Sequence, residues 1–176
     1  VVVPGHAMAR WASRLRTGFP DARLVPGGDR RQDSVRRGVE QVGRLGAEVV
    51  AVHDAARPLV DPGDVRAVVE ALEDVDAAIL CEEVVDTVKR IDAGGLVVET
   101  VPRDRLRRAQ TPQVARVAAL TRAWNAVDET VEWTDEAALL EAVGATVRTV
   151  LARRPNPKLT TAADLLLMRA LAGGEV

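Results

Sequence analysis

The stretch EVVAVHDAARP, residues 48–58, sets the fold class of this chain. It opens with a continuous apolar run, which is typical of a strand buried in an α/β sheet. The polar residues that follow would lie at the carboxyl end of that strand, where open α/β sheets bind ligands. There Asp54 could hold Mg²⁺ or a ribose hydroxyl, and the small Ala55 leaves room for a ligand. The alternatives are a charged turn closed by an Asp54–Arg57 ion pair and, for His53, a hydrogen-bonded structural histidine.

Strand-like and helix-like segments alternate on both sides of this stretch, and the alternation predicts an α/β fold. Asp61-Pro62 supplies an N-cap and a first-turn proline for one helix. Thr161-Ala162-Ala163-Asp164 is a capping box for the last helix. We expect strands at 1–3, 23–25, 48–52, 77–81 and 146–151, and helices at 8–15, 35–42 with Gly46 as C-cap, 62–72, 117–127, 134–143 and from 161 onward.

A hairpin signal interrupts this alternation between Asp86 and Val101. Two β-rich stretches, residues 87–91 and 96–101, flank the turn sequence Asp92-Ala93-Gly94-Gly95. Glycine pairs of this kind supply the backbone freedom that tight hairpin turns need. We therefore expect one domain over residues 1–176, from which a β-arm projects.

The composition limits the classes of function. With 176 residues, 47% apolar and 28% charged, the chain is long enough for one domain with a real core. Its net charge of −2 and its 2% of aromatic residues disfavour nucleic-acid binding. The apolar runs fall far short of the roughly 20 residues that cross a bilayer, so we expect no membrane partner. The single cysteine, Cys81, makes no internal disulfide, which suits the cytoplasm.

Scarce residues mark the segment ahead of the last helix. Only two of the 24 basic residues are lysines, Lys89 and Lys158, and the only asparagines are Asn125 and Asn156. In so arginine-rich a chain, the remaining lysines and asparagines are expected where an ammonium or a primary amide is needed. Asn156-Pro157-Lys158 precedes a helix N-terminus, where free N–H groups and a lysine together favour an anion.

Two motifs have a functional and a structural interpretation. Gly27-Gly28 precedes a helix and could bring the backbone close to a ligand, or Asp33 or Ser34 could simply cap that helix. The arginines at 103, 105, 107 and 108 could grip a phosphate, or they could form a solvated basic face. The sequence alone leaves both pairs of interpretations open.

Two further motifs say little by themselves. Thr134-Asp135-Glu136 has the composition of a helix N-cap with acidic residues in the first turn. Gln110-Thr111-Pro112-Gln113 is polar and extended. Neither arrangement contains a metal cluster, a Ser-His-Asp order or a cysteine nucleophile.

The order and spacing of the motifs resemble those of one enzyme family, the 2-C-methyl-D-erythritol 4-phosphate cytidylyltransferases, over residues 1–167. In chain order they are GGDRRQDSV (27–35), VHDAARP (52–58), DTVK (86–89), TVPR (100–103), QTPQ (110–113), TDEA (134–137) and NPKLTT (156–161). The resemblance implies a doubly wound, Rossmann-like nucleotidyltransferase of the nucleotide-diphospho-sugar transferase type. It also implies Mg²⁺-dependent cytidylyl transfer from CTP to methylerythritol phosphate, in non-mevalonate isoprenoid synthesis, by a homodimer joined through a β-arm at residues 86–103.

Roles for individual residues follow from the same resemblance. The nucleotide would contact Gly28, Ser34, Asp54 and Ala55, and Asp54 would also lie at the metal. The polyol phosphate would contact Arg57, Thr87, Arg103, Thr111, Thr134 and Lys158. Of these, Arg103 and Lys158 are the expected catalytic residues, because they would position the phosphate for in-line attack. Thr87 and Arg103 lie on the arm and would reach the substrate of the neighbouring subunit.

The chain departs from the family pattern at its start. The family opens with a strand, an AAGxGxRM loop and a PKQ-type segment, and these motifs do not occur in the sequence. We therefore expect an N-terminally incomplete domain without its first βα units and with little activity on its own. A partial sequence is favoured over a non-catalytic remnant, because every downstream motif is present.

Two questions stay open at this point. A ribitol 5-phosphate cytidylyltransferase would share the fold, the nucleotide and the arm. The paired alanines at 55–56 and the RQDS sequence at 31–34 favour methylerythritol phosphate. A second pathway domain fused downstream is the other open question. Pro157 stands where the family usually has an aliphatic residue, and it stiffens the loop without removing Asn156 or Lys158.

Overall fold

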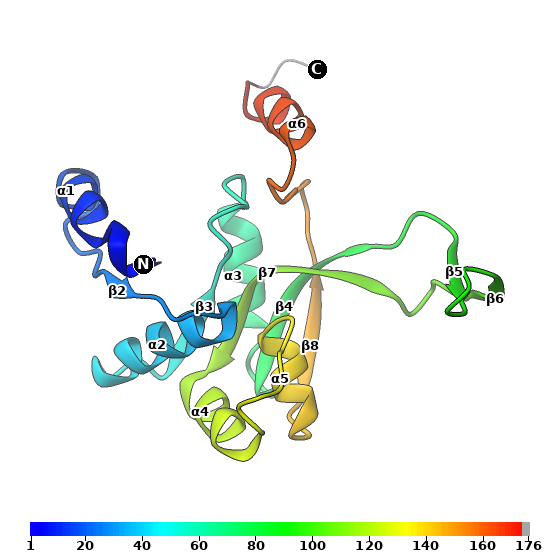
Figure 1. The fold of residues 1–176 in the computed structure, drawn as a ribbon, viewed down its shortest axis with the longest axis horizontal. Helices are drawn as coiled ribbons and strands as arrows, with labels where there is room; N and C mark the ends of the chain where they lie inside the picture. The colour runs from blue at the N-terminus through cyan, green and yellow to red at the C-terminus, as the bar shows by residue number, and fades with distance from the viewer. Residues whose placement is uncertain (174–176) are drawn as a thin grey trace.

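A mixed, four-stranded sheet forms the centre of the molecule (Figure 1). The computed structural model describes residues 1–173. β4 and β8 run parallel, whereas β7 runs antiparallel to both of its neighbours, β3 and β4. Gln113 of β7 therefore lies between Val52 of β3 and Ile79 of β4. In the sheet the strand order is β3 (Val49–Val52), β7 (Arg107–Arg116), β4 (Ala77–Glu83), β8 (Val147–Leu151).

Helices cover both faces of this sheet, as the predicted doubly wound arrangement requires. One core cluster joins α3 (Pro62–Glu70) to Ala78, Leu80 and Val114. The other core cluster contains Ala77 and Ala115, the immediate neighbours of Ala78 and Val114. Because successive side chains of a strand point to opposite faces, the two clusters lie on opposite sides of the sheet. The second cluster is closed by α2 (Arg31–Arg44), α4 (Val117–Ala126) and α5 (Glu136–Ala142).

β7 is the longest strand, and the sequence does not predict it. Its first residues belong to an arginine-rich run, and Pro112 interrupts it, which argues against a central strand. The structure accommodates the proline in a bulge. Between the pairs Ile79–Gln113 and Cys81–Ala109 there are four steps along β7 and only two along β4. Such a bulge redirects side chains and is frequent beside active sites.

β3 forms where the sequence predicts it, but the expectation of burial was wrong. Its four residues alternate between exposed and half-buried side chains, and Val49 is 38% exposed. The physical reason is that β3 is the edge strand, since it pairs with β7 on one side only. The open side of β3 faces a groove described below.

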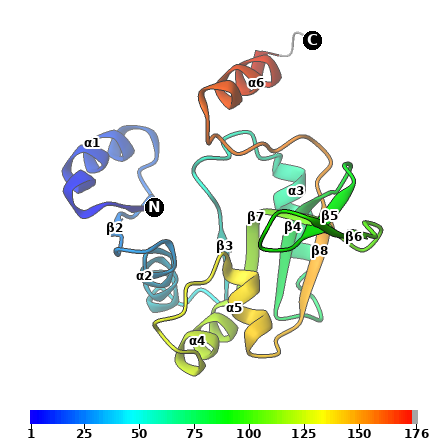
Figure 2. The same ribbon diagram turned by 45° about the vertical axis from the view of Figure 1, so that its right-hand side comes forward.

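A separate parallel ribbon precedes the sheet. β1 (Val2–Val3) pairs with β2 (Val25–Pro26), and α1 (Met8–Gly18) connects them after one 3-10 turn at Gly5–Ala7. The second strand lies further along the chain than the predicted 23–25. None of the α1 side chains is buried. Figure 2 shows α1 apart from the helices that cover the sheet.

The predicted hairpin is confirmed as an arm that projects from the sheet (Figure 1). β5 (Val88–Ile91) and β6 (Val97–Val101) pair with each other in antiparallel register. The Asp92 carboxylate accepts hydrogen bonds from the backbone N–H of Gly94 and of Leu96, both at 2.9 Å. Large apolar side chains on the arm are exposed, namely Ile91, Leu96, Val97 and Val98.

The remaining helices have the predicted caps, with one correction. Asp61 accepts from the N–H of Gly63 at 2.6 Å and begins α3. Thr161 and Asp164 exchange the two hydrogen bonds of a capping box at the start of α6 (Ala162–Gly173). α5 is capped by Asp135 rather than by Thr134. Across residues 1–173, no helix is both long and apolar enough to span a bilayer.

Candidate active site

A groove of about 670 Å³ opens between the β1–β2 ribbon, α2 and the free edge of β3. Its volume lies within the ~300–1,000 Å³ of small-molecule sites. Valines form much of its floor, and polar side chains gather where β3 ends. These polar or small residues are Arg31, Ser34, His53, Asp54 and Ala55. Three residues predicted to bind the nucleotide, Ser34, Asp54 and Ala55, therefore line one groove.

Four charged side chains of alternating sign meet at the end of this groove. Lys158 Nζ lies 2.9 Å from Asp54 Oδ2, and Arg31 Nη2 lies 3.7 Å from Asp54 Oδ1. Arg31 in turn donates two hydrogen bonds, of 2.8 and 3.0 Å, to the carboxylate of Glu136. The ion pair that the sequence suggests within the turn, Asp54 with Arg57, does not form. Asp54 instead bridges cations that come from α2 and from the segment before α6.

The pKa of the Asp54 carboxyl reflects this arrangement. Partial burial raises the pKa, but the hydrogen bond and charge of Lys158, with the charges of Arg31 and Arg57, outweigh burial and lower the pKa below its ordinary value. Partial burial lowers the pKa of Arg31, but the hydrogen bonds and charge of Glu136 and the charge of Asp54 outweigh it, so that the pKa is raised above its ordinary value. Asp54 is therefore an anion throughout the neutral range, as a ligand for a cation or a polyphosphate–metal complex must be.

β7 fixes the loop that carries Asp54. The Thr111 hydroxyl accepts the backbone N–H of Asp54 at 3.0 Å and lies 3.1 Å from His53 Nδ1. His53 Nε2 lies 2.9 Å from the carbonyl oxygen of Arg57. A carbonyl only accepts, so Nε2 carries the proton and Nδ1 accepts from Thr111 in the neutral ring. Both ring nitrogens are thus occupied, as the structural interpretation of His53 predicts.

The glycine turn before α2 packs too tightly for any other residue. A Cβ atom on Gly28 would lie 2.4 Å from Asp33 Cβ, and one on Gly27 would lie 2.8 Å from Ser34 Oγ. The Ser34 hydroxyl accepts the N–H of Gly28 at 3.1 Å. The N-cap of α2 is Arg30, so the expectation that Asp33 or Ser34 caps this helix was wrong. Ser34, which lines the groove, instead holds the turn at Gly28.

Comparison with known proteins gives the family. The family model of 2-C-methyl-D-erythritol 4-phosphate cytidylyltransferase matches residues 1–173. The chain belongs to this family. Among solved structures of methylerythritol-phosphate cytidylyltransferases, that from Thermus thermophilus superposes with a TM-score of 0.74 at 32% identity. The superposition covers 97% of this chain and 91% of that one, and it confirms the predicted nucleotidyltransferase fold.

Two curated relatives show how much of the family's length is present. The 2-C-methyl-D-erythritol 4-phosphate cytidylyltransferase of Acidobacterium capsulatum is 41% identical over 155 residues, which are 85% of this chain and 65% of that protein. The bifunctional enzyme IspD/IspF of Rhodospirillum rubrum is 46% identical over 151 residues, 86% of this chain and 39% of that protein. The chain therefore spans less than two thirds of the length of these relatives.

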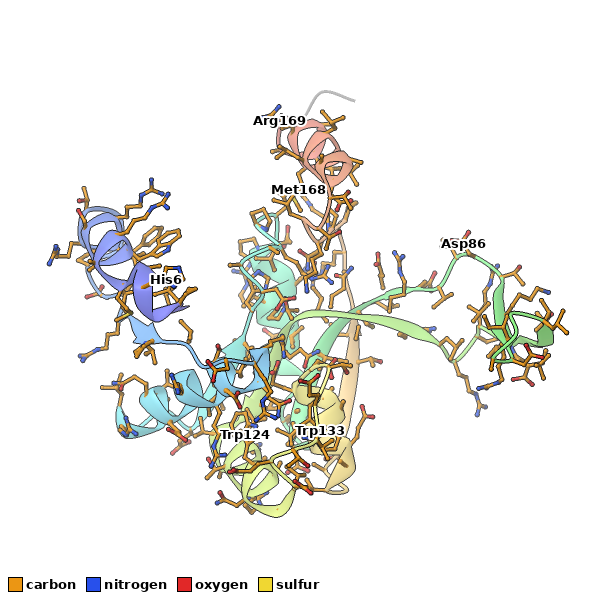
Figure 3. All side chains as sticks on the ribbon, in the orientation of Figure 1. His6, Asp86, Trp124, Trp133, Met168 and Arg169 are labelled. Carbon is orange, nitrogen blue, oxygen red and sulfur yellow. The ribbon has the colours of Figure 1, made fainter. Side chains whose placement is uncertain are left out.

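Three predicted substrate residues lie apart from the Asp54–Lys158 pair. Thr134 is exposed immediately before the cap of α5. Thr87 and Arg103 lie at the base of the arm, where Arg103 donates to the carbonyl oxygen of Val85. Figure 3 shows the neighbouring Asp86 out along the extension. Within residues 1–173, no hydrogen bond or ion pair joins these side chains to Asp54 or Lys158.

The other predicted substrate residues meet near Asp54. Arg57 Nη1 donates to the carbonyl oxygen of Asn156 at 2.6 Å, and the N–H of Leu159 donates to the carbonyl oxygen of Ala56 at 2.8 Å. These two bonds join the Asp54 loop to the Lys158 segment. Together with Thr111, they place Asp54, Arg57 and Lys158 around the same end of the groove.

Sequence reasoning assigned no site role to four polar residues that shape this site: Arg31, Glu136, Gln110 and Gln113. Gln113 shows why they matter, because its Nε2 donates to Asp135 and its Oε1 accepts the N–H of Ala137. β7 thereby holds the start of α5, which carries Glu136. No local signal could have found Glu136 or Gln110, because their partners Arg31 and Asn156 lie 105 and 46 residues away in the chain.

Proposed function

We propose that this chain is the cytidylyltransferase domain of an enzyme that transfers a cytidylyl group from CTP to 2-C-methyl-D-erythritol 4-phosphate. The family membership supports the reaction. The observation that carries the proposal is the Asp54–Lys158 pair at the end of the groove, bounded by Arg31 and Arg57. Such a set of one carboxylate and several cations suits a bound nucleotide triphosphate and a second phosphate.

In the proposed reaction, a phosphate oxygen of the polyol substrate attacks the α-phosphorus of CTP. A new P–O bond forms, the bond from the α-phosphorus to the bridging oxygen of the β-phosphate breaks, and pyrophosphate leaves with the electron pair. The attacking oxygen is already anionic, so no protein nucleophile is needed. Lys158 and Arg103 position that phosphate, and Lys158 offsets charge that develops on the transferred group.

A magnesium ion fits the donor set around Asp54. Mg²⁺ commonly binds through one or two carboxylates, keeps several waters and takes its other ligands from substrate phosphates. Asp54 is ionised, partly exposed and positioned at the groove, whereas the structure of residues 1–173 contains no cluster of three acidic, cysteine or histidine ligands. When bound, the ion would neutralise phosphate charge, and Asp54 would hold it.

The groove contacts suggest how the substrates divide the site. Gly28 and Ser34, joined by a hydrogen bond, would contact the cytosine, and Ala55 beside Asp54 leaves space for the ribose. Arg57, Thr111 and Thr134 would contribute to the polyol-phosphate pocket. Thr111 already contacts Asp54 and His53, which favours a role in fixing the loop as well as in binding.

We further propose that the protein is a homodimer joined by the arm, with its site in the cytoplasm. The exposed apolar side chains of β5 and β6 support association, because large exposed apolar patches mark interaction surfaces. Thr87 and Arg103 lie at the arm base, apart from Asp54. They would act on the substrate of the neighbouring subunit. The cytoplasm suits the one free cysteine, Cys81.

The test is pyrophosphate release by the full-length gene product, given CTP, Mg²⁺ and either methylerythritol phosphate or ribitol 5-phosphate. We expect turnover with the first acceptor. Lys158→Ala should lower kcat by roughly 10²–10³, the usual effect of losing one such electrostatic group. Arg148→Ala, which removes a surface ion pair with Asp74 and a bond to the carbonyl oxygen of Ala71, is the control. Turnover with ribitol 5-phosphate alone, or an unchanged Lys158→Ala variant, would refute the proposal.

A further inference from the structure

The segment that carries Lys158 has no backbone donor at the residues on either side of Asn156. It runs from the end of β8 at Leu151 to the start of α6 at Ala162. Pro155 and Pro157 lie on either side of Asn156, and proline has no N–H to donate. On one side of Lys158 the N–H of Leu159 donates to Ala56, and on the other side the segment is held by the side chain of Asn156.

Asn156 provides the most buried of these contacts. It is 2% exposed, and its Nδ2 donates to Gln110 Oε1 at 3.2 Å and to the carbonyl oxygen of Thr111 at 2.9 Å. Both facing groups are acceptors, so a primary amide satisfies them and a carboxylate or an aliphatic side chain does not. A buried acceptor that loses its donor destabilises the fold. The chain's scarce asparagine is thus placed where its two N–H groups are required.

The acceptors for Asn156 lie in the bulge of β7. Gln110 is 3% exposed, and Thr111 follows it in the chain. Thr111 offers its carbonyl oxygen to Asn156 and its hydroxyl to the N–H of Asp54. The two members of the Asp54–Lys158 pair are therefore held by the same residue of one strand. This coupling is the geometric reason that Lys158 Nζ lies 2.9 Å from Asp54 Oδ2.

We propose that Asn156 is a positioning residue for Lys158, with Gln110 and Thr111 as its acceptors. Because Asn156 is 2% exposed, it would act through Lys158 and not by contact with a substrate. It fixes the segment on β7, so that the Lys158 ammonium stays over the place where the phosphates bind. This inference rests on the proposed cytidylyl transfer for its kinetic consequence, whereas the anchoring itself is a property of the fold.

The kinetic test is a double-mutant cycle between Asn156 and Lys158 in the full-length gene product. Asn156→Ala should lower kcat by roughly 10–100-fold, the range found for partners that orient a functional ligand. In a Lys158→Ala background, the same change should cost less than about threefold, because the group that it positions is already gone. Asn125→Ala, on the exposed face of α4, is the control and should retain wild-type kcat. Equal losses in both backgrounds would overturn the inference, since a general structural defect acts on both alike.

A second measurement is independent of activity. The N–H of Leu159 is hydrogen-bonded to Ala56, so its hydrogen exchange reports the attachment of the segment. In Asn156→Ala, and in the isosteric Asn156→Asp, this amide should exchange at least tenfold faster, while amides of β4 keep their protection. Unchanged exchange at Leu159 would reject the anchoring role. If the wild-type protein made no pyrophosphate, the proposed reaction would be wrong. The exchange rate at Leu159 would still decide whether Asn156 anchors the segment.

Discussion

Asp54 depends on neighbours that are far away in the chain. Its charge is opposed by Lys158 at 2.9 Å and Arg31 at 3.7 Å, so its pKa stays low despite partial burial. We expect Asp54→Asn to lower kcat/KM by roughly 10²–10³, because a neutral amide cannot hold the metal or balance the cations. Pyrophosphate release at fixed Mg²⁺ measures the loss. Asp74→Asn, in an exposed pair with Arg148, is the control, and a loss below threefold at Asp54 would contradict its role.

Glu136 illustrates a residue whose main effect is expected on stability. Its side chain is 5% exposed, and it carries a two-bond ion pair with the partly exposed Arg31. Glu136→Gln should lower the free energy of unfolding by about 1–3 kcal/mol, less than for a fully buried pair because water reaches Arg31. Urea denaturation measures the change. The exposed variant Arg90→Gln, on the arm, should show no measurable change, and an equally stable Glu136→Gln would disprove the argument.

The sequence identifies some of these residues and not others for a physical reason. Asp54 and Lys158 stand out because a carboxylate follows an apolar run and a lone lysine precedes a helix. Glu136 and Gln110 look like an ordinary first-turn acid and a loop amide. Their roles arise from contacts with Arg31 and Asn156, which lie 105 and 46 residues away in the chain. No local pattern encodes such partners.

The arm is an element that folds on itself. β5 and β6 pair with each other, and their apolar side chains are exposed. We expect replacement of residues 88–101 by a short Gly-Ser linker to give a monomer with an unchanged melting temperature, because little of the core is removed. Light scattering after size exclusion gives the mass. A dimer that persists without residues 88–101 would assign the association to another surface.

The start of α6 should respond to acid. The side chain and backbone of Thr160, with those of Thr161, lower the pKa of the Asp164 carboxyl from 3.8 to about 2. The pKa of Asp164 is lower in the folded protein than in the unfolded chain. This carboxylate therefore stabilises the protein above pH 4, and its contribution to stability is lost as the pH falls toward 2. The stability difference between wild type and Asp164→Asn should therefore shrink between pH 5 and pH 3 in urea titrations. A difference independent of pH would contradict the cap.

Local signals predicted most elements, and β7 shows where they stop. The hairpin turn, the Asp61 cap and the Thr161–Asp164 box are encoded within a few residues, and the structure confirms them. β7 begins with arginines and contains Pro112, so its own composition argues against a central strand. It is a strand because β3 and β4 supply partners on both sides and because the bulge removes the proline from the ladder.

At the scale of the whole molecule, protection should fall from the sheet outward. β4 and β7 lie between two core clusters, whereas none of the α1 side chains is buried. We expect amides of β4 to exchange only through global unfolding and amides of α1 to exchange through low-energy local opening. Hydrogen exchange followed by mass spectrometry tests this order. Addition of CTP should slow hydrogen exchange in residues 27–34 and 53–55. If the amides of α1 were as protected as those of β4, the expected order would be wrong.

The bulge in β7 also constrains how relatives of this protein can differ in length. The bulge lies between the arm and the loops that carry Asp54 and Lys158. Insertion or deletion of one residue there would turn the following side chains of β7 to the opposite face of the sheet. Insertions and deletions are therefore expected to accumulate in the turn at residues 92–96, because a longer or shorter turn there does not change the register of the central sheet. Residues 107–113 should keep a constant length even among relatives in which most of their side chains have been exchanged.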